Sequence, residues 1–133
     1  MSFRDRMRVD PSNAEIQVTM ELQKQGITEL ERDWVLLIKD LEVVPMRKEQ
    51  VKTEDLEDVR FTLPDWFSKS QLKTVELDGP HHKKGRTAER DEELRNALRK
   101  RDYKVKEIPY NGRRLSQANL SKVVTKIKEF LEK

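Results

Sequence analysis

A run of five large apolar residues, Trp-Val-Leu-Leu-Ile at residues 34–38, is the feature that most constrains the fold. Only 35% of the residues are hydrophobic and 40% are charged, so a core forms only if such runs are buried. The run therefore predicts a buried strand. A chain of 133 residues has room for one domain, so we expect residues 1–133 to form a single domain whose residues 1–11 are flexible.

The other apolar periodicities predict alternating helices and strands. Start signals at Asp10-Pro11-Ser12 and a stop at Gly26 predict a helix that runs to about residue 25. A second apolar piece is interrupted by Pro45, and a polar stretch after it predicts a loop or short helix; these two segments are residues 41–46 and 48–57. Further strands are predicted at residues 59–63, 72–77 and 103–108, and helices at residues 87–101 and 116–131. The order α-β-β-β-α-β-α predicts an α/β fold, with a mixed β-sheet flanked by helices.

Composition excludes several function classes. The chain has no cysteine, which rules out disulfides, thiolate nucleophiles and Cys-ligated zinc. It also lacks a signal-peptide pattern and an apolar run of roughly 20 residues, so we expect a cytoplasmic protein with no membrane partner. The net charge of +3 is ordinary, but cations gather at residues 81–86 and 99–101. Such runs can contact phosphates, although they are more often simply solvated.

Three carboxylates and a histidine are the candidate chemical groups. Asp65 follows a proline at a strand start, and Glu76 and Asp78 are two residues apart on one predicted strand, so they share a face. Converging carboxylate oxygens are the ligands that Mg²⁺ prefers. The same spacing also fits the solvated face of an edge strand, and spacing alone does not choose between the two. His82 can act as a general base near neutral pH, although a single loop histidine is more often only exposed.

The order of these groups resembles the core of the PD-(D/E)XK nucleases, in particular the branch that includes the very-short-patch-repair (Vsr) endonucleases. The likeness spans residues 61–110 and combines Pro64-Asp65, an E-x-D-G-x-x-H signature from Glu76 to His82, an Arg-Asp pair early in the next helix and an aromatic-Lys-Val strand. It implies a restriction-endonuclease-like fold. It also implies a metal-dependent endonuclease that nicks or cleaves DNA in repair, at junctions or at specific sites.

The resemblance assigns roles to individual residues. Asp65, Glu76 and Asp78 are implied as ligands of Mg²⁺, with Mn²⁺ as the alternative ion. Asp78 stands where most nucleases of this superfamily have lysine, which places His82 as the group that activates the water. Lys83, Lys84 and Arg86 are the expected contacts to the nucleic-acid backbone. In the next helix we expect Arg90 or Asp91 to point toward the site, and Arg90 could either contact a phosphate through its two-pronged guanidinium or form an ion pair that braces the helix. RNA stays open as a substrate, and so do a homodimer and a separate targeting subunit.

The superfamily usually adds a glutamate from the first helix. At about 100° per residue, Glu15 falls within the arc of the apolar residues of that helix and Glu21 falls outside it. We therefore predict that Glu15 faces the sheet. An ordinary first-turn glutamate, favoured by the helix dipole, explains Glu15 equally well.

Two other functions remain compatible with the sequence. One is a non-catalytic nucleic-acid-binding domain with a nuclease-like fold, which the missing lysine supports and the joint presence of Asp65, Glu76, Asp78 and His82 opposes. The other is an interaction module whose charged surface binds another protein.

Overall fold

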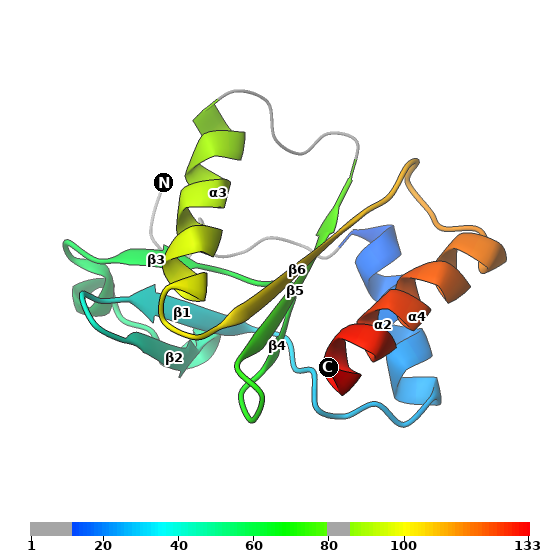
Figure 1. Ribbon diagram of the computed structural model, residues 1–133, viewed down its shortest axis with the longest axis horizontal. Helices are drawn as coiled ribbons and strands as arrows, with labels where there is room; N and C mark the ends of the chain where they lie inside the picture. The colour runs from blue at the N-terminus through cyan, green and yellow to red at the C-terminus, as the bar shows by residue number, and fades with distance from the viewer. Residues whose placement is uncertain (1–11, 80–85) are drawn as a thin grey trace.

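The computed structural model describes residues 12–79 and 86–133, except for the side chains of residues 86–88, and places them in an α/β arrangement (Figure 1). Within this part of the chain the helices are α2 (Asn13–Lys24), α3 (Arg86–Arg99) and α4 (Gln117–Glu132). Ser12 caps α2 and Ser116 caps α4 by accepting a hydrogen bond from a backbone amide in the first turn. The predicted helices are confirmed to within about two residues at each end.

The described strands form two three-stranded sheets. The first has the order β2-β1-β3 and is antiparallel; its strands are β1 (Trp34–Ile38), β2 (Val43–Arg47) and β3 (Arg60–Thr62). Short 3₁₀ turns, η1 (Lys48–Gln50) and η2 (Thr53–Leu56), connect β2 to β3. The second has the order β4-β5-β6, with strands β4 (Trp66–Ser68), β5 (Lys73–Asp78) and β6 (Lys104–Pro109). In it, β5 is antiparallel to β4 and parallel to β6.

The predicted order and the predicted single mixed sheet are wrong in two respects. Among the described residues five strands, not three, precede α3, and they belong to two separate sheets. An isolated bridge pairs Glu31, which precedes β1, with Phe67 of β4. The three-residue strand β4 is too short to show a period-2 pattern, so it was not predicted. Pro45 does not interrupt its strand, because β2 is an edge strand and its backbone needs no donor there.

Apolar side chains pack on both faces of the β4-β5-β6 sheet. One face is covered by α2 and α4, whose buried residues meet Trp66, Val75 and Ile108 (Figure 1). The other face meets α3 and β1 through Phe67, Leu98 and neighbouring residues. Alternate residues of β5 therefore face different layers, which decides where its polar side chains go.

Burial of β1 confirms the interpretation of the apolar run. All five of its residues are buried. Trp34, Leu36 and Ile38 pack toward α3, whereas Val35 and Leu37 pack against the residues around η1 and η2. A strand covered on both faces needs apolar residues at every position, which explains the uninterrupted run.

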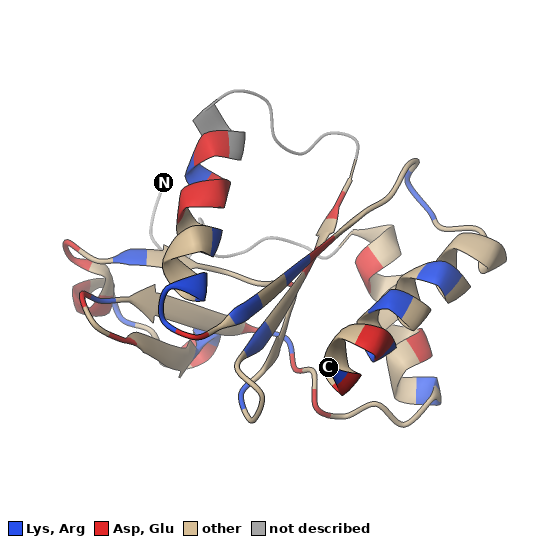
Figure 2. Cartoon of the chain, in the orientation of Figure 1, with Lys and Arg blue, Asp and Glu red and all other residues tan. Residues whose placement is uncertain are grey.

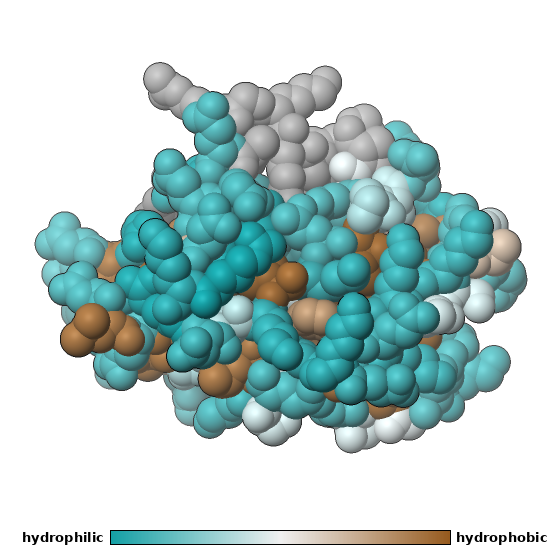
Figure 3. Space-filling view, in the orientation of Figure 1, coloured by the Kyte–Doolittle hydropathy of each residue, from teal (hydrophilic) through white to brown (hydrophobic). Residues whose placement is uncertain are grey.

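The surface fits this burial pattern. Figure 3 shows a mostly hydrophilic face on which apolar residues form small, separate patches. No helix among the described residues is long and apolar enough to cross a membrane.

Lys73, the first residue of β5, is a buried cation that holds the end of α4. Its side chain is buried, and its Nζ donates to the carbonyl oxygens of Phe130, Leu131 and Lys133 at 2.7, 3.2 and 3.0 Å. The last carbonyls of a helix lack partners within the helix and carry partial negative charge. Lys73 satisfies them and fixes α4 on the sheet.

Candidate active site

Glu76 and Asp78 lie at the carboxyl end of β5, on the face toward α3. Their neighbours Val75 and Leu77 point to the opposite face and are buried in the core with α2 and α4. The side chains of Glu76 and Asp78 are 21% and 19% exposed, and β5 is the central strand of its sheet. The alternative of a solvated edge strand is therefore wrong, and the two carboxylates do share a face as predicted.

Asp65 is placed beside them by the short hairpin of β4 and β5. It directly precedes β4, and Trp66 is paired with Val75 of β5. One carboxylate oxygen of Asp65, Oδ2, accepts a hydrogen bond of 2.8 Å from the backbone N–H of Leu77. The backbone of β5 thus fixes Asp65 next to the Glu76–Asp78 pair.

Glu15 has both of the roles considered for it. It completes a capping box with Ser12, so it is an ordinary first-turn glutamate. Its other oxygen accepts a hydrogen bond of 3.1 Å from Arg32, and its carboxylate also pairs with Asp65. Glu21 instead accepts a hydrogen bond from Gln25 on the outer side of α2. The helical arc therefore selected the glutamate that lies near Asp65.

Asp65 and Glu15 share a proton unequally. Burial raises the pKa of Asp65 to about 8, and the hydrogen bond and negative charge of Glu15 act in the same direction. Burial alone would raise the pKa of Glu15, but hydrogen bonds from Asp65, Ser12 and Arg32 lower it below its ordinary value. Asp65 is thus the partner that keeps the proton, while Glu15 stays ionised beside Arg32.

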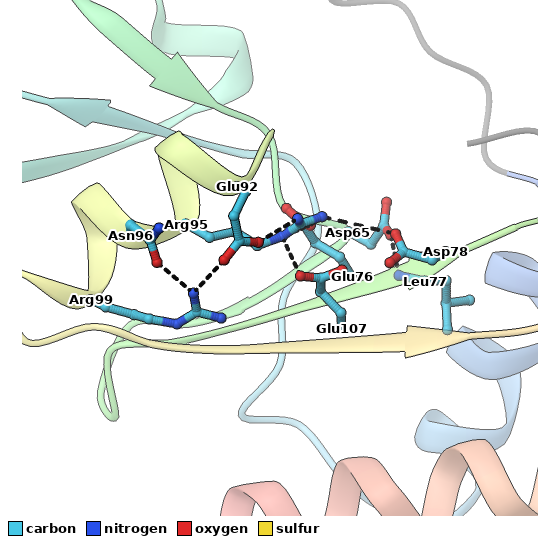
Figure 4. Close-up of polar contacts among 9 residues, drawn as sticks. All are labelled: Asp65, Glu76, Leu77, Asp78, Glu92, Arg95, Asn96, Arg99 and Glu107. Atoms are coloured by element: carbon cyan, nitrogen blue, oxygen red, sulfur yellow. Dashed lines mark hydrogen bonds and ion pairs between the residues drawn. The ribbon is translucent and has the colours of Figure 1, made fainter. Parts of the chain in front are cut away.

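Arg95 of α3 is buried among the carboxylates (Figure 4). Its Nε and Nη2 both donate to Oε2 of Glu76, at 3.2 and 3.0 Å. The same guanidinium lies 2.9 Å from Glu107 and 3.4 Å from Glu92, and 4.0 Å from Asp78. One buried cation therefore serves several acidic groups from α3, β5 and β6.

Glu107 is a further carboxylate of this cluster. It lies on β6 directly beside Glu76 in the parallel register. Burial raises the pKa of Glu107 to about 7, and the hydrogen bond to Asp78 adds to the rise while Arg95 opposes it. Burial also raises the pKa of Glu76, against the opposing charge of Arg95. Neither Arg95 nor Glu107 was predicted as a site residue.

A cavity of about 260 Å³ opens over these carboxylates. Three of the predicted groups, Asp65, Glu76 and Asp78, line it together. The remaining lining residues come from β3 and the loop after it, from β5 and from α3: Phe61, Thr62, Leu63, Leu77, Asp91 and Leu94. The site is thus an acidic hollow between the end of β5, β3 and α3.

Of the predicted basic residues, none is shown to line the acidic cavity. Asp91 lines the acidic cavity, whereas Arg90 is exposed and lines a neighbouring cavity of about 200 Å³ with Arg60 and Glu93. Arg86 is the first residue of α3, and its side chain lies outside the description. His82, Lys83 and Lys84 lie outside the described residues altogether. Their roles stay predictions.

Gly79, directly after Asp78, lies against the side chain of Tyr110, which a larger residue there would have to displace. A Cβ at this position would lie 2.8 Å from the hydroxyl oxygen of Tyr110. The backbone N–H of Tyr110 also donates to the carbonyl oxygen of Asp78 at 2.9 Å. This close approach joins the ends of β5 and β6 directly beside the acidic cavity.

The donor set suits a hard divalent cation, but the side chains do not form a finished coordination shell. Asp65, Glu76 and Asp78 offer carboxylate oxygens to one cavity, and burial together with the neighbouring Glu15 raises the pKa of Asp65. As they stand, no three acidic or histidine side chains among the described residues converge closely enough to hold a metal ion. Oε2 of Glu76 is used by Arg95.

Comparisons with known proteins add no assignment. No protein-family model matches the chain, and neither the curated proteins nor the solved structures contain a match. The site therefore has to be interpreted from its own geometry.

Proposed function

We propose that this protein is a metal-dependent endonuclease that hydrolyses DNA phosphodiester bonds. The observation that carries the proposal is the joint placement of Asp65, Glu76 and Asp78 around one cavity, with Glu15 paired to Asp65. The β2-β1-β3 sheet lies between Glu15 and Asp65 in the sequence, so the fold brings these two residues together. Buried like charges are costly, and a site that keeps them is a candidate for function.

In this proposal Asp65, Glu76 and Asp78 hold Mg²⁺ or Mn²⁺. A bound ion would polarise the scissile phosphate and lower the pKa of a water molecule. Glu15 keeps Asp65 in place, and Arg95 fixes the orientation of Glu76 by two hydrogen bonds to one of its oxygens. His82 as the water-activating group, and Lys83, Lys84, Arg86 and Arg90 as backbone contacts, remain part of the proposal on sequence grounds.

The fold assignment belongs to the same proposal. The antiparallel β4–β5 hairpin carries the acidic groups, and β6 returns parallel to β5 after α3. This arrangement supports a restriction-endonuclease-like fold of the kind that the sequence motifs imply.

One observation favours the second candidate, a non-catalytic nucleic-acid-binding domain. Arg95 already neutralises Glu76, and a built-in cation can replace a metal ion in an acidic cluster. The two candidates differ in one measurable property, since only the nuclease needs a divalent ion to break the DNA backbone.

Plasmid nicking tests the proposal. The purified protein is incubated with supercoiled plasmid in Mg²⁺, in Mn²⁺ or in EDTA, beside Asp65→Asn and Asp78→Asn. The matched control is Asp40→Asn, an exposed carboxylate on the turn between β1 and β2. We expect nicking in either metal and none in EDTA. Both site variants should lose more activity than the roughly 10- to 100-fold that is lost when a hydrogen-bond partner of a metal ligand is changed.

Three results would contradict the proposal. Nicking that persists in EDTA would mean that the reaction needs no metal ion. Equal activity in Asp65→Asn and Asp40→Asn would mean that the cavity is not the site. Binding of DNA without nicking in either metal would favour the non-catalytic domain.

A further inference from the structure

The segment from residue 108 to residue 128 differs from the rest of the chain in charge. Asp and Glu make up 25 of the 133 residues, yet these 21 positions contain none. They contain five cations: Arg113, Arg114, Lys122, Lys126 and Lys128. Helix α3, by contrast, mixes acidic and basic residues along its length. A cationic surface without interspersed acids favours a polyanionic partner.

Four of these cations are exposed and available. Arg113 and Arg114 lie in the loop before α4, and Lys122 and Lys126 lie one turn apart on the outer face of α4. Within the described residues, none of the four forms an ion pair with a carboxylate. Lys128 differs, because it donates to Gln25 of α2. We call Arg113, Arg114, Lys122 and Lys126 the basic rim.

Two contacts place the loop that carries Arg113 and Arg114 beside the end of β5 and the start of α2. At the start of the loop, the N–H of Tyr110 donates to the carbonyl of Asp78. At its end, buried Leu115 exchanges two hydrogen bonds, of 2.9 and 2.8 Å, with the side chain of Gln17. Gln17 is two residues from Glu15 on α2. The arginines are therefore held between the two elements that carry Asp78 and Glu15.

The rim continues from this loop along α4. Figure 2 shows basic segments on the loop after β6 and on the visible side of α4, with acidic segments at the ends of β5 and β6. Lys122 and Lys126 are about 6 Å apart along the helix axis. Phosphates of one DNA strand are roughly 3.4 Å apart along the duplex axis, so the spacing of the two lysines is close to two phosphate steps. Glu129 falls on the same side one turn later, which ends the acid-free stretch.

We propose that the basic rim binds the phosphate backbone of a nucleic acid and leads that strand to the acidic cavity. The choice of nucleic acid among polyanions rests on the proposed function. The placement has a physical reason, because an acidic cavity repels phosphates and needs cations at its border. This surface is distinct from the contacts predicted at Lys83, Lys84, Arg86 and Arg90.

Fluorescence anisotropy of a short labelled DNA duplex in EDTA tests the rim without any cleavage. The rim variant carries Arg113→Gln, Arg114→Gln, Lys122→Gln and Lys126→Gln. The control removes the same charge from exposed lysines elsewhere, with Lys24→Gln, Lys39→Gln, Lys52→Gln and Lys100→Gln. Circular dichroism and thermal unfolding establish that both variants are folded, as expected for surface substitutions.

The salt dependence gives the expected size of the effect. Each phosphate contact contributes about 0.9 to the slope of log K against log salt, or roughly eightfold in affinity at about 0.1 M salt. We expect the rim variant to lose at least about fiftyfold in affinity and two to four units of slope between about 50 and 200 mM salt. The control variant should lose less than about tenfold.

Each other outcome overturns the inference. Equal losses in the two variants would mean that only total charge matters. If the wild-type protein binds neither duplex nor single-stranded DNA, the rim is not a nucleic-acid site. The same conclusion follows if it binds anionic phospholipid vesicles instead of DNA. Because the titration uses EDTA, a protein that binds through the rim but never cleaves keeps this inference and refutes the nuclease. Nicking with the same salt dependence in the rim variant and the control variant would keep the nuclease proposal and refute the inference about the rim.

Discussion

Two buried cations are associated with the opposite ends and opposite faces of β5, and their surroundings differ. Lys73 at the start of the strand meets three carbonyl oxygens of α4, which are neutral dipoles. Arg95 meets the carboxylates near the end of the strand, including Glu76, Glu92 and Glu107. The first cation completes a closed structural contact. The second lies among several carboxylates at the cavity that we propose as the metal site.

Loss of Arg95 should have the largest effect on stability. In Arg95→Met, the buried carboxylates lose their cation, and removal of one partner from a buried ion pair typically costs about 3–5 kcal/mol. We expect urea unfolding to show a loss of this size, partly restored by Mg²⁺, which can take over the neutralising role. A variant as stable as the wild type would mean that the carboxylates need no counter-ion.

Loss of Lys73 should cost less and should not respond to metal. Lys73→Met leaves the last carbonyl groups of α4 without a donor, at a cost of about 1–2 kcal/mol. The cost is modest because some of these carbonyl groups can accept hydrogen bonds from water instead. The same urea measurement in Mg²⁺ and in EDTA should give the same difference from the wild type. If Mg²⁺ restored the stability of Lys73→Met as well, the two buried cations of β5 would not differ in their response to metal.

The pH dependence of stability should single out Asp65. Because its pKa is raised from 3.8 to about 8, the folded protein keeps a proton that the unfolded chain releases in this interval. The free energy of unfolding therefore falls as the pH rises through this window. Without metal, the fall in Tm between about pH 5 and about pH 8 should shrink by at least roughly 3 °C in Asp65→Asn. Equal falls in the two proteins would contradict the raised pKa of Asp65.

Glu92 provides the smallest effect and a control within the same cluster. Its side chain is 51% exposed, although it contacts Arg95 at 3.4 Å. Exposed ion pairs contribute about 0–1 kcal/mol, so Glu92→Gln should change urea stability by less than about 0.5 kcal/mol. A loss comparable with that of Arg95→Met would mean that the exposed ion pair with Glu92, rather than the buried pairs of Arg95, provides most of the stabilisation.

Much of this site could be predicted from residue spacing. The period of two in β5 placed Glu76 and Asp78 on one face, and the helical arc chose Glu15 over Glu21. Both inferences concern neighbours within one element, where local geometry decides. The buried run at β1 was predictable for the same reason.

The groups that complete the site depend on contacts between elements. Arg95 appears in the sequence as one cation in a highly charged helix, and nothing local shows that it is buried while Arg99 is exposed. Glu107 faces Arg95 only because β6 pairs in parallel register with β5. The division into two sheets was missed because β4 has three residues and carries no periodic signal. The absence of Asp and Glu from residues 108–128 was visible in the sequence, but the position of Arg113 and Arg114 between the end of β5 and α2 was not.

Calorimetric titration with Mn²⁺ tests the central claim, that the acidic cavity at the end of β5 holds a divalent cation, most directly. Wild-type protein should bind Mn²⁺ saturably and Asp40→Asn should bind it equally well, whereas Asp65→Asn and Asp78→Asn should bind it at least about tenfold more weakly. Lys73→Met, which perturbs the other buried cation, should keep the wild-type affinity. Equal Mn²⁺ affinity in all five proteins, or no saturable binding by the wild type, would contradict the account.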